Sequence, residues 1–215
     1  KANKEQPQKQ PQTNKTSLPQ DKNLNQTQNK NNKIVFWAKE FLAKNTKTVV
    51  INGKQVAINT DCSNFVRAVY WKALEVDLFY ESVSSGAANS NAKSGCLLLH
   101  AYFSKKHRFN KNPKAGDIVF FDNTYDKNLN KKWDDPLTHV GLVENIEKDG
   151  TVSYIHGNTG SPKAIKKAYL NIKYPSTYQQ AGKTINTYLR KKYEWETVAQ
   201  RKQLSGQLVK GFGGY

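Results

Sequence analysis

A change of hydrophobic period about halfway along the chain restricts its fold more than any other feature. Apolar residues from Phe65 to Ala73 fall on one stripe of a helix. From Gly116 they come in short runs instead, beginning with four in a row at 118–121, which are typical of a strand buried on both faces. Helices followed by antiparallel strands predict an α+β domain.

The same patterns locate the individual elements. We expect helices over 34–43, over 97–103 and from Cys62, which lies in the first turn of its helix. A hairpin is expected at 49–58, turning at Asn52-Gly53. Polar loops are expected at 86–94 and 122–137, and the remaining expected strands are 139–146 and 151–156, joined at Asp149-Gly150, then 188–193 and a weaker one near Leu208.

Residues 1–32 differ in composition from everything that follows. They are nearly all Lys, Gln, Asn, Thr and Pro, with only three apolar residues and no aromatic one. Such a segment buries too little surface to offset the entropy of ordering, so we predict a disordered polar linker or tail. The folded domain is then expected at 33–175, with 176–215 as a C-terminal extension packed on it.

The chain is strongly basic, with 34 Lys and Arg against 17 Asp and Glu and a formal charge of +17. This balance indicates an anionic partner, unless it reflects only a Lys- and Asn-rich proteome. No helix-turn-helix, zinc-finger or RNP-type pattern is present, so nucleic acid is not expected. No apolar run of about 18 residues occurs, so no transmembrane segment is predicted.

Cys62 is the first candidate for chemistry. A helix N-terminus favours a thiolate, the nucleophilic form of Cys. Asp61 or Thr60 is expected to cap this helix, with Ser63 as a further supporting residue, although the charge of Asp61 opposes ionisation of the thiol. The alternative is a buried Cys that only packs.

Two histidines supply a candidate base. In the hairpin around Asp149-Gly150, every symmetric register places His139, His156 and Asn158 on one face of the sheet. One of these residues can act as a base while another fixes its tautomer and orientation. The pattern does not choose between His156 and Asn158 as the orienting residue, and an asymmetric bulge would remove the common face.

The remaining Cys, Cys96, is expected to be a small core residue at the start of a helix. A Cys62–Cys96 disulfide is the less favoured alternative because it would consume the proposed nucleophile. A zinc site formed by Cys62, His139 and His156 is also less favoured, since a polar partner for the base explains the same residues. We therefore predict no metal and no cofactor.

Four segments carry a family resemblance. Residues 61–66, Asp-Cys-Ser-Asn-Phe-Val, resemble the Asp-Cys-Ser-Gly-Phe-Val signature of the NlpC/P60 cysteine peptidases. Residues 116–121 resemble the family's Gly-Asp-Leu-Val-Phe-Phe strand, 139–142 its His-Val-Gly-Ile, and 154–156 the strand that ends in its third polar residue. The segments follow the family's order.

The resemblance implies a circularly permuted papain-like fold and cleavage of amide bonds in the peptide stems of bacterial peptidoglycan. It implies Cys62 as nucleophile, His139 as general base and His156 as orienter. The related CHAP amidases often have Glu or Asn at the third position, so Asn158 stays a candidate. Asn64 replaces the signature Gly, and the usual aromatic-and-glycine stretch before the Cys is missing.

Localisation and substrate follow from the same resemblance. It implies an exported bacterial protein, periplasmic or at the cell surface. The chain begins at Lys1 and contains no Met, and we expect that its signal has already been removed. Peptidoglycan or another anionic wall polymer is the expected partner. Two alternatives remain: a non-catalytic binder of such polymers on a degenerate site, and an acyl transferase that uses the same Cys and His.

Overall fold

The structure is a computed structural model that describes residues 19–159 and 162–215. The helices are α1 (Pro19–Ala43), α2 (Cys62–Leu74), α3 (Leu78–Ser84), α4 (Gly95–Lys105), the short 3-10 helix η1 (Val198–Gln200) and α5 (Ser205–Leu208). The strands are β1 (Thr48–Ile51), β2 (Lys54–Ala57), β3 (Phe109–Asn110), β4 (Ile118–Phe121), β5 (His139–Ile146), β6 (Val152–Thr159), β7 (Ala164–Leu170), β8 (Gln179–Gln180), β9 (Lys183–Thr184) and β10 (Val209–Gly213).

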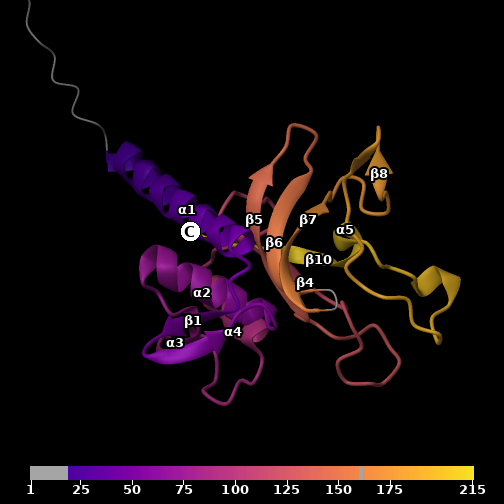
Figure 1. Ribbon diagram of the computed structural model, residues 1–215, viewed down its shortest axis with the longest axis horizontal. Coiled ribbons are helices and arrows are strands. Elements are labelled where there is room, and N and C mark those ends of the chain that lie inside the picture. Colours follow the sequence, from indigo (N-terminus) through magenta and orange to yellow (C-terminus); the bar gives the residue numbers. More distant parts are fainter. Residues whose placement is uncertain (1–18, 160–161) are drawn as a thin grey trace, which may run out of the picture.

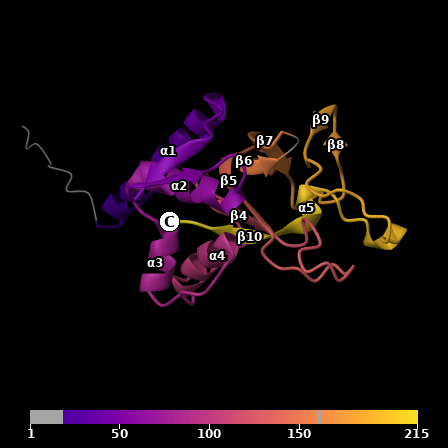
Figure 2. The same cartoon turned by 60° about the horizontal axis from the view of Figure 1, so that its bottom comes forward.

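An antiparallel sheet of six strands, in the order β3-β10-β4-β5-β6-β7, forms the centre of the molecule. Helices α1 to α4 gather on one side of this sheet, and the segment between β7 and β10, with β8 and the short α5, lies on the other side (Figures 1 and 2). The predicted α+β class is therefore confirmed.

Strand β4 shows why the sheet is buried on both faces. Ile118 and Phe120 pack into the core shared with α1, α2 and α4, whereas Val119 and Phe121 pack into a second core on the opposite face. All four side chains are fully buried. The predicted two-sided burial of residues 118–121 is confirmed, and it places the next strand, β5, in the middle of the fold.

The tail predicted at residues 1–32 is wrong from Pro19 onward, because α1 begins there; residues 1–18 lie outside the described part of the chain. Ile34, Ala38 and Phe41 anchor the helix in the core. Once a helix is nucleated, each added residue gains a hydrogen bond, so polar residues can extend it. Asn31 is itself buried.

The C-terminal residues differ from the expected extension in one respect: β10 is inserted between β3 and β4, inside the main sheet. The strand expected at 188–193 is wrong. Only Tyr188 forms an isolated bridge, with Leu204, and Arg190 makes a buried ion pair with Glu196 instead of continuing a strand. Helix α3, strand β7 and the β8–β9 hairpin were not predicted.

Among the described helices, none combines the length and the apolar character needed to cross a membrane.

Candidate active site

The N-terminus of α2 positions Cys62, its first residue. Asp61 is the N-cap, and its carboxylate accepts hydrogen bonds from the backbone N–H groups of Ser63 and Asn64, each at 2.9 Å. The hydroxyl of Ser63 donates to the same carboxylate oxygen at 2.7 Å. Asp61, rather than Thr60, is therefore the cap, and these bonds fix the first turn that carries the thiol.

Two glycines allow close packing around the site, one against the start of α2 and the other between β5 and β6. A Cβ added to Gly157 would lie 2.6 Å from the carbonyl oxygen of Ile58, in the segment before α2. A Cβ added to Gly141 would lie 2.8 Å from the ring of Tyr154 and 3.2 Å from the Cβ of His156. Gly157 therefore lets β6 approach the start of α2, and Gly141 leaves room for the ring of Tyr154 and for His156 beside β5.

The β5–β6 hairpin contains a bulge of the kind that could have separated the two histidines. The bulge shifts the register by one residue between Val143 and Asn145. The turn shifts it by one residue as well, since Thr151 pairs with Glu147 and not with Lys148 as in a two-residue turn. The two irregularities cancel, so the histidines keep to one face. His139 Nε2 and His156 Nδ1 lie 2.8 Å apart, and both rings are buried.

Burial holds the pKa of His156 well below its ordinary value, and the neighbouring His139 and Lys166 act in the same direction. His156 is therefore neutral at neutral pH. The direction of the hydrogen bond between the two rings follows from their tautomers: when the proton of His156 is on Nε2, its Nδ1 accepts from the Nε2–H of His139. The ring of Tyr154, 5.1 Å from that of His156, restricts its orientation.

Asn158 occupies a different position. It lines the same cleft, but its backbone N–H donates to the carbonyl of Asn59 at 3.0 Å. Its side-chain Oδ1 is buried and accepts no hydrogen bond within the described part of the chain. Of the two residues considered as orienters, His156 is the one hydrogen-bonded to His139.

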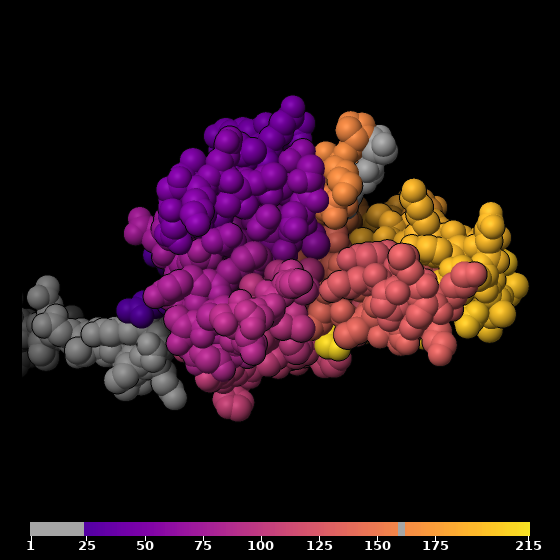
Figure 3. All heavy atoms as spheres, turned by 90° about the horizontal axis from the view of Figure 1, so that it is seen from below, coloured from indigo at the N-terminus to yellow at the C-terminus, as the bar shows by residue number. Residues whose placement is uncertain are grey.

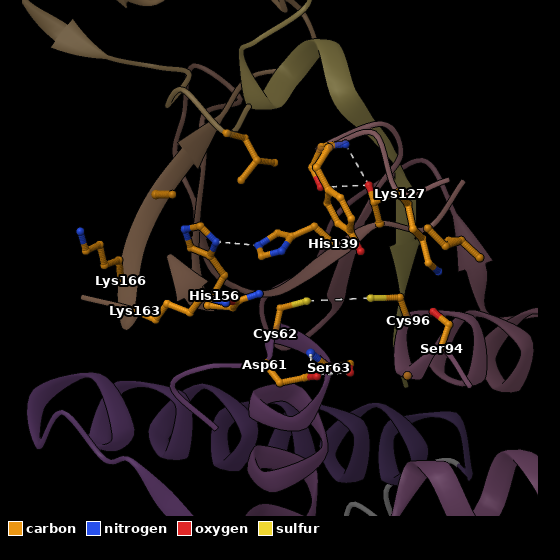
Figure 4. Close-up of a pocket in the computed structure, with 18 of the residues that line it drawn as sticks. Asp61, Cys62, Ser63, Ser94, Cys96, Lys127, His139, His156, Lys163 and Lys166 are labelled. Atoms are coloured by element: carbon orange, nitrogen blue, oxygen red, sulfur yellow. Dashed lines mark hydrogen bonds between the residues drawn. The ribbon is translucent and has the colours of Figure 1, made fainter. Parts of the chain in front are cut away.

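Cys96 lies beside the proposed nucleophile, a placement that the sequence did not predict. It is buried, as expected for a core residue, but its Sγ is 3.9 Å from the Sγ of Cys62 (Figure 4). Both sulfurs are thiols rather than a disulfide. The only sequence signal was that Gly95-Cys96 begins a helix; nothing local pointed to α2.

The two thiols are not equivalent. Hydrogen bonding from Cys96, the adjacent imidazole of His139 and a backbone hydrogen bond from Val140 hold the pKa of the Cys62 thiol well below its ordinary value, against the effect of burial. The bond to Cys62 and burial raise the pKa of Cys96 well above its ordinary value. These opposite directions favour the thiolate at Cys62 and the protonated thiol at Cys96.

A cleft of about 820 Å³ opens onto these groups. Its walls come from three parts of the chain: the starts of α2 and α4, the loop 122–137 with the strands β5 to β7, and residues 187–189 of the C-terminal segment. In Figure 3 the salmon segment that contains this loop lies between the magenta helices and the yellow C-terminal residues. The cleft is basic, being lined by Lys93, Lys127, Lys163, Lys166 and Lys167 and by one acidic residue, Asp61.

The loop 122–137 is internally bonded. Asp126 and Asp135 are buried, and their carboxylates accept hydrogen bonds from backbone N–H groups within the loop. The hydroxyl of Thr138 accepts bonds at 2.9 Å from the backbone and side chain of Thr124. The loop is thus an ordered wall of the cleft.

Among the described residues, no group of three or more His, Cys, Asp or Glu side chains is placed to hold a metal ion.

Comparison with known proteins identifies one family. No curated protein and no solved structure matches the chain significantly. The family model of the CHAP domain matches residues 51–158, a range that includes Asp61, Cys62, both histidines and Asn158. CHAP domains are generally amidases or peptidases that depend on Cys and His, and they indicate peptidoglycan hydrolysis as the class of activity. With just over half of its residues matched, this chain belongs to the CHAP domain family, in the NlpC/P60-like group of cysteine peptidases and amidases.

Proposed function

We propose that the protein is a cysteine hydrolase that cleaves amide bonds in the peptide stems of peptidoglycan, as an endopeptidase or an amidase. The observation that carries this proposal is the arrangement at one end of α2. A thiol with a lowered pKa, Cys62, begins the helix beside His139, which is hydrogen-bonded to His156. Family membership supplies the substrate class.

The proposed mechanism begins with His139 holding the proton of the Cys62 thiol. The thiolate attacks the amide carbonyl, and the oxyanion is stabilised by the backbone N–H of Cys62 and a neighbouring donor at the helix start. His139 then protonates the departing amine, which leaves an acyl-enzyme. Water, deprotonated by His139, attacks the thioester and releases the acid product.

His156 serves as the orienter in this scheme. By accepting from Nε2–H of His139, it fixes the tautomer in which the other ring nitrogen, Nδ1, is free to exchange protons with the thiol and substrate. A neutral His156 orients the base without adding a second charge to a buried site. Asp61 and Ser63 act through the helix cap that holds Cys62, so they are positioning residues.

The charge of the cleft supports an anionic substrate. The cleft is lined by five lysines, of which Lys167 is paired with Glu144, and by one carboxylate, so it has a positive potential that suits the negative charge of stem peptides and wall polymers. We propose, on the same grounds, that the protein acts outside the cytoplasm, in the periplasm or at the cell surface, where such polymers lie. Association is then expected to weaken as salt screens these charges.

The test is a digest of purified peptidoglycan with the native chain and with Cys62→Ala. Soluble products are separated by chromatography and identified by mass spectrometry. New stem-peptide fragments from the native chain alone support the proposal and name the bond. If both proteins sediment with the wall and neither releases fragments, the hydrolase assignment is wrong and the basic cleft is a binding site for anionic wall polymer.

A further inference from the structure

We propose that Cys96 is a resolving thiol for Cys62, and that the pair reacts with hydroperoxides to form a reversible disulfide that switches the nucleophile off. The effect on activity rests on the proposed function, in which Cys62 is the nucleophile. The formation of the disulfide does not, because it depends only on where the two sulfurs lie.

The first support is the placement of the sulfurs. Cys62 and Cys96 are 34 positions apart in sequence and begin two different helices, α2 and α4, yet their Sγ atoms are 3.9 Å apart. A disulfide bond is about 2.05 Å long, so the sulfurs must approach by about 2 Å. Rotation of two short side chains at helix starts can supply a movement of that size.

The second support is that this proximity is built into the packing. Gly95, which precedes Cys96, touches the first turn of α2 so closely that an added Cβ would lie 2.7 Å from the Cβ of Ser63. It also touches α3, where the same Cβ would lie 2.6 Å from the ring of Phe79. A residue with a side chain would push the two helix starts apart. The glycine therefore keeps the second thiol within reach of the first.

The third support is access for a small oxidant. Both Cys residues line the open cleft, although each side chain is largely buried against protein. In the proposed function the Cys62 thiol is accessible to a peptide carbonyl of the substrate. A hydroperoxide is smaller than such a peptide and can therefore reach the same thiol. The neighbouring His139 and the cationic cleft favour a thiolate at Cys62, which is the form that peroxides oxidise.

The chemistry balances with a hydroperoxide as the sole oxidant. The Cys62 thiolate attacks the terminal peroxide oxygen, which breaks the O–O bond and gives a sulfenic acid and, after protonation, an alcohol or water. Cys96 then loses its proton and attacks the Cys62 sulfur; the S–S bond forms, the S–O bond breaks and hydroxide leaves as water. Two electrons have passed from the two thiols to the peroxide. Exchange with two reducing thiols restores both Cys residues.

The resolving step has a protective consequence. A sulfenic acid that meets no thiol is oxidised further to sulfinic acid, which ordinary thiols do not reverse. With Cys96 in contact, the disulfide forms first and stores the nucleophile in a recoverable state.

The experiment treats the reduced full chain with hydrogen peroxide and follows intact mass, thiol count and peptide maps. The native chain is expected to lose two hydrogens and both thiols together, with one peptide pair linking Cys62 to Cys96 within a monomer. The matched variant Cys96→Ser, which keeps a hydrogen-bonding group but cannot form the disulfide, is expected to gain oxygen atoms at Cys62 instead. After dithiothreitol, the native chain should recover most of its own starting activity and Cys96→Ser less than about a tenth.

The proposal is overturned if the native chain accumulates oxygen adducts at Cys62 and forms no internal linkage. The native chain alone decides this point, so poor folding of the variant would not obscure it. If the linkage forms but the reduced chain cleaves no peptidoglycan, the proposed function is wrong and the thiol pair stands. If the chain cleaves peptidoglycan but forms no linkage, the proposed function stands and the resolving role of Cys96 is wrong.

Discussion

Gly95 lies against Ser63 so closely that a Cβ on the glycine would sit 2.1 Å from the Ser63 hydroxyl oxygen. Ser63 is at the same time bonded to the cap of α2 through Asp61. One contact thus joins the starts of two helices, and each of those starts carries a Cys. The geometry of the candidate site depends on the absence of a single methyl group.

Gly95→Ala is therefore expected to destabilise the protein, although Ala is intrinsically better than Gly inside a helix. Overpacking of this kind costs about 1–3 kcal/mol, which outweighs the gain in helix propensity. Urea unfolding of both proteins measures the difference. The control is Ser94→Ala: the Ser94 side chain makes no capping hydrogen bond, so its loss should change stability by no more than about 0.5 kcal/mol. Equal stability of Gly95→Ala and the native chain would contradict the close packing.

Much of this site could be predicted from local sequence, and what could not be predicted has a physical reason. The helix start at Asp61-Cys62 and the turn at Asp149-Gly150 are local signals, and the structure has both elements where they were expected. The common face of the histidines was correct although the hairpin contains a bulge, because the turn compensates for it. The alternation of side chains along the strands could not choose between His156 and Asn158 as the orienter. That choice depends on the tertiary packing that brings the His156 ring to His139.

The features that the sequence did not predict are set by contacts between distant segments. Cys96 reaches Cys62 only through the packing of α4 on α2. Strand β10, near the C-terminus, enters the sheet beside β4, some 90 residues earlier in the chain, and no local pattern encodes that partner. The polar residues 19–32 are helical because they continue a helix that Ile34 and Phe41 anchor.

The two candidate orienters can be separated by substitution. His156→Ala removes the acceptor from His139 and should lower kcat by about a hundredfold or more, because the base loses its tautomer and orientation. The matched variant is Asn158→Gly: Asn158 has a positive φ of 63°, which glycine adopts without strain. It should retain kcat within a few fold of the native value. Rates are measured on soluble wall fragments at saturating substrate, and a larger loss in Asn158→Gly would reverse the assignment.

Stability should also depend on pH through Asp117, whose side chain is almost fully buried. Burial raises the pKa of its carboxyl group to about 6, well above the ordinary value. The folded state therefore holds a proton that the unfolded state has already lost. The contribution of protonated Asp117 to the free energy of unfolding is fully present below about pH 4 and is lost as the pH rises through about 6.

Asp117→Asn removes this titration, so the difference in unfolding free energy between variant and native chain should move in favour of the variant between pH 4 and pH 7. Urea unfolding at several pH values measures it. Taking the difference between the two proteins cancels the contribution of His156, whose lowered pKa works in the opposite sense by destabilising the fold as the solution becomes acidic. A difference that does not change with pH would show that Asp117 does not titrate in this range.

The lysines of the cleft give the last prediction. Lys163 and Lys166 lie on the β7 side of the site, near His156 (Figure 4). The double variant Lys163→Gln/Lys166→Gln should raise KM for anionic wall fragments several fold and reduce its dependence on salt, because screening acts on fewer charges at the cleft. Lys39→Gln, on the exposed surface of α1, removes charge away from the cleft and should leave KM nearly unchanged. A control that matches the loss of two charges combines Lys39→Gln with Lys54→Gln on β2. If this double variant raises KM as much as Lys163→Gln/Lys166→Gln does, the total charge of the protein rather than the cleft attracts the substrate.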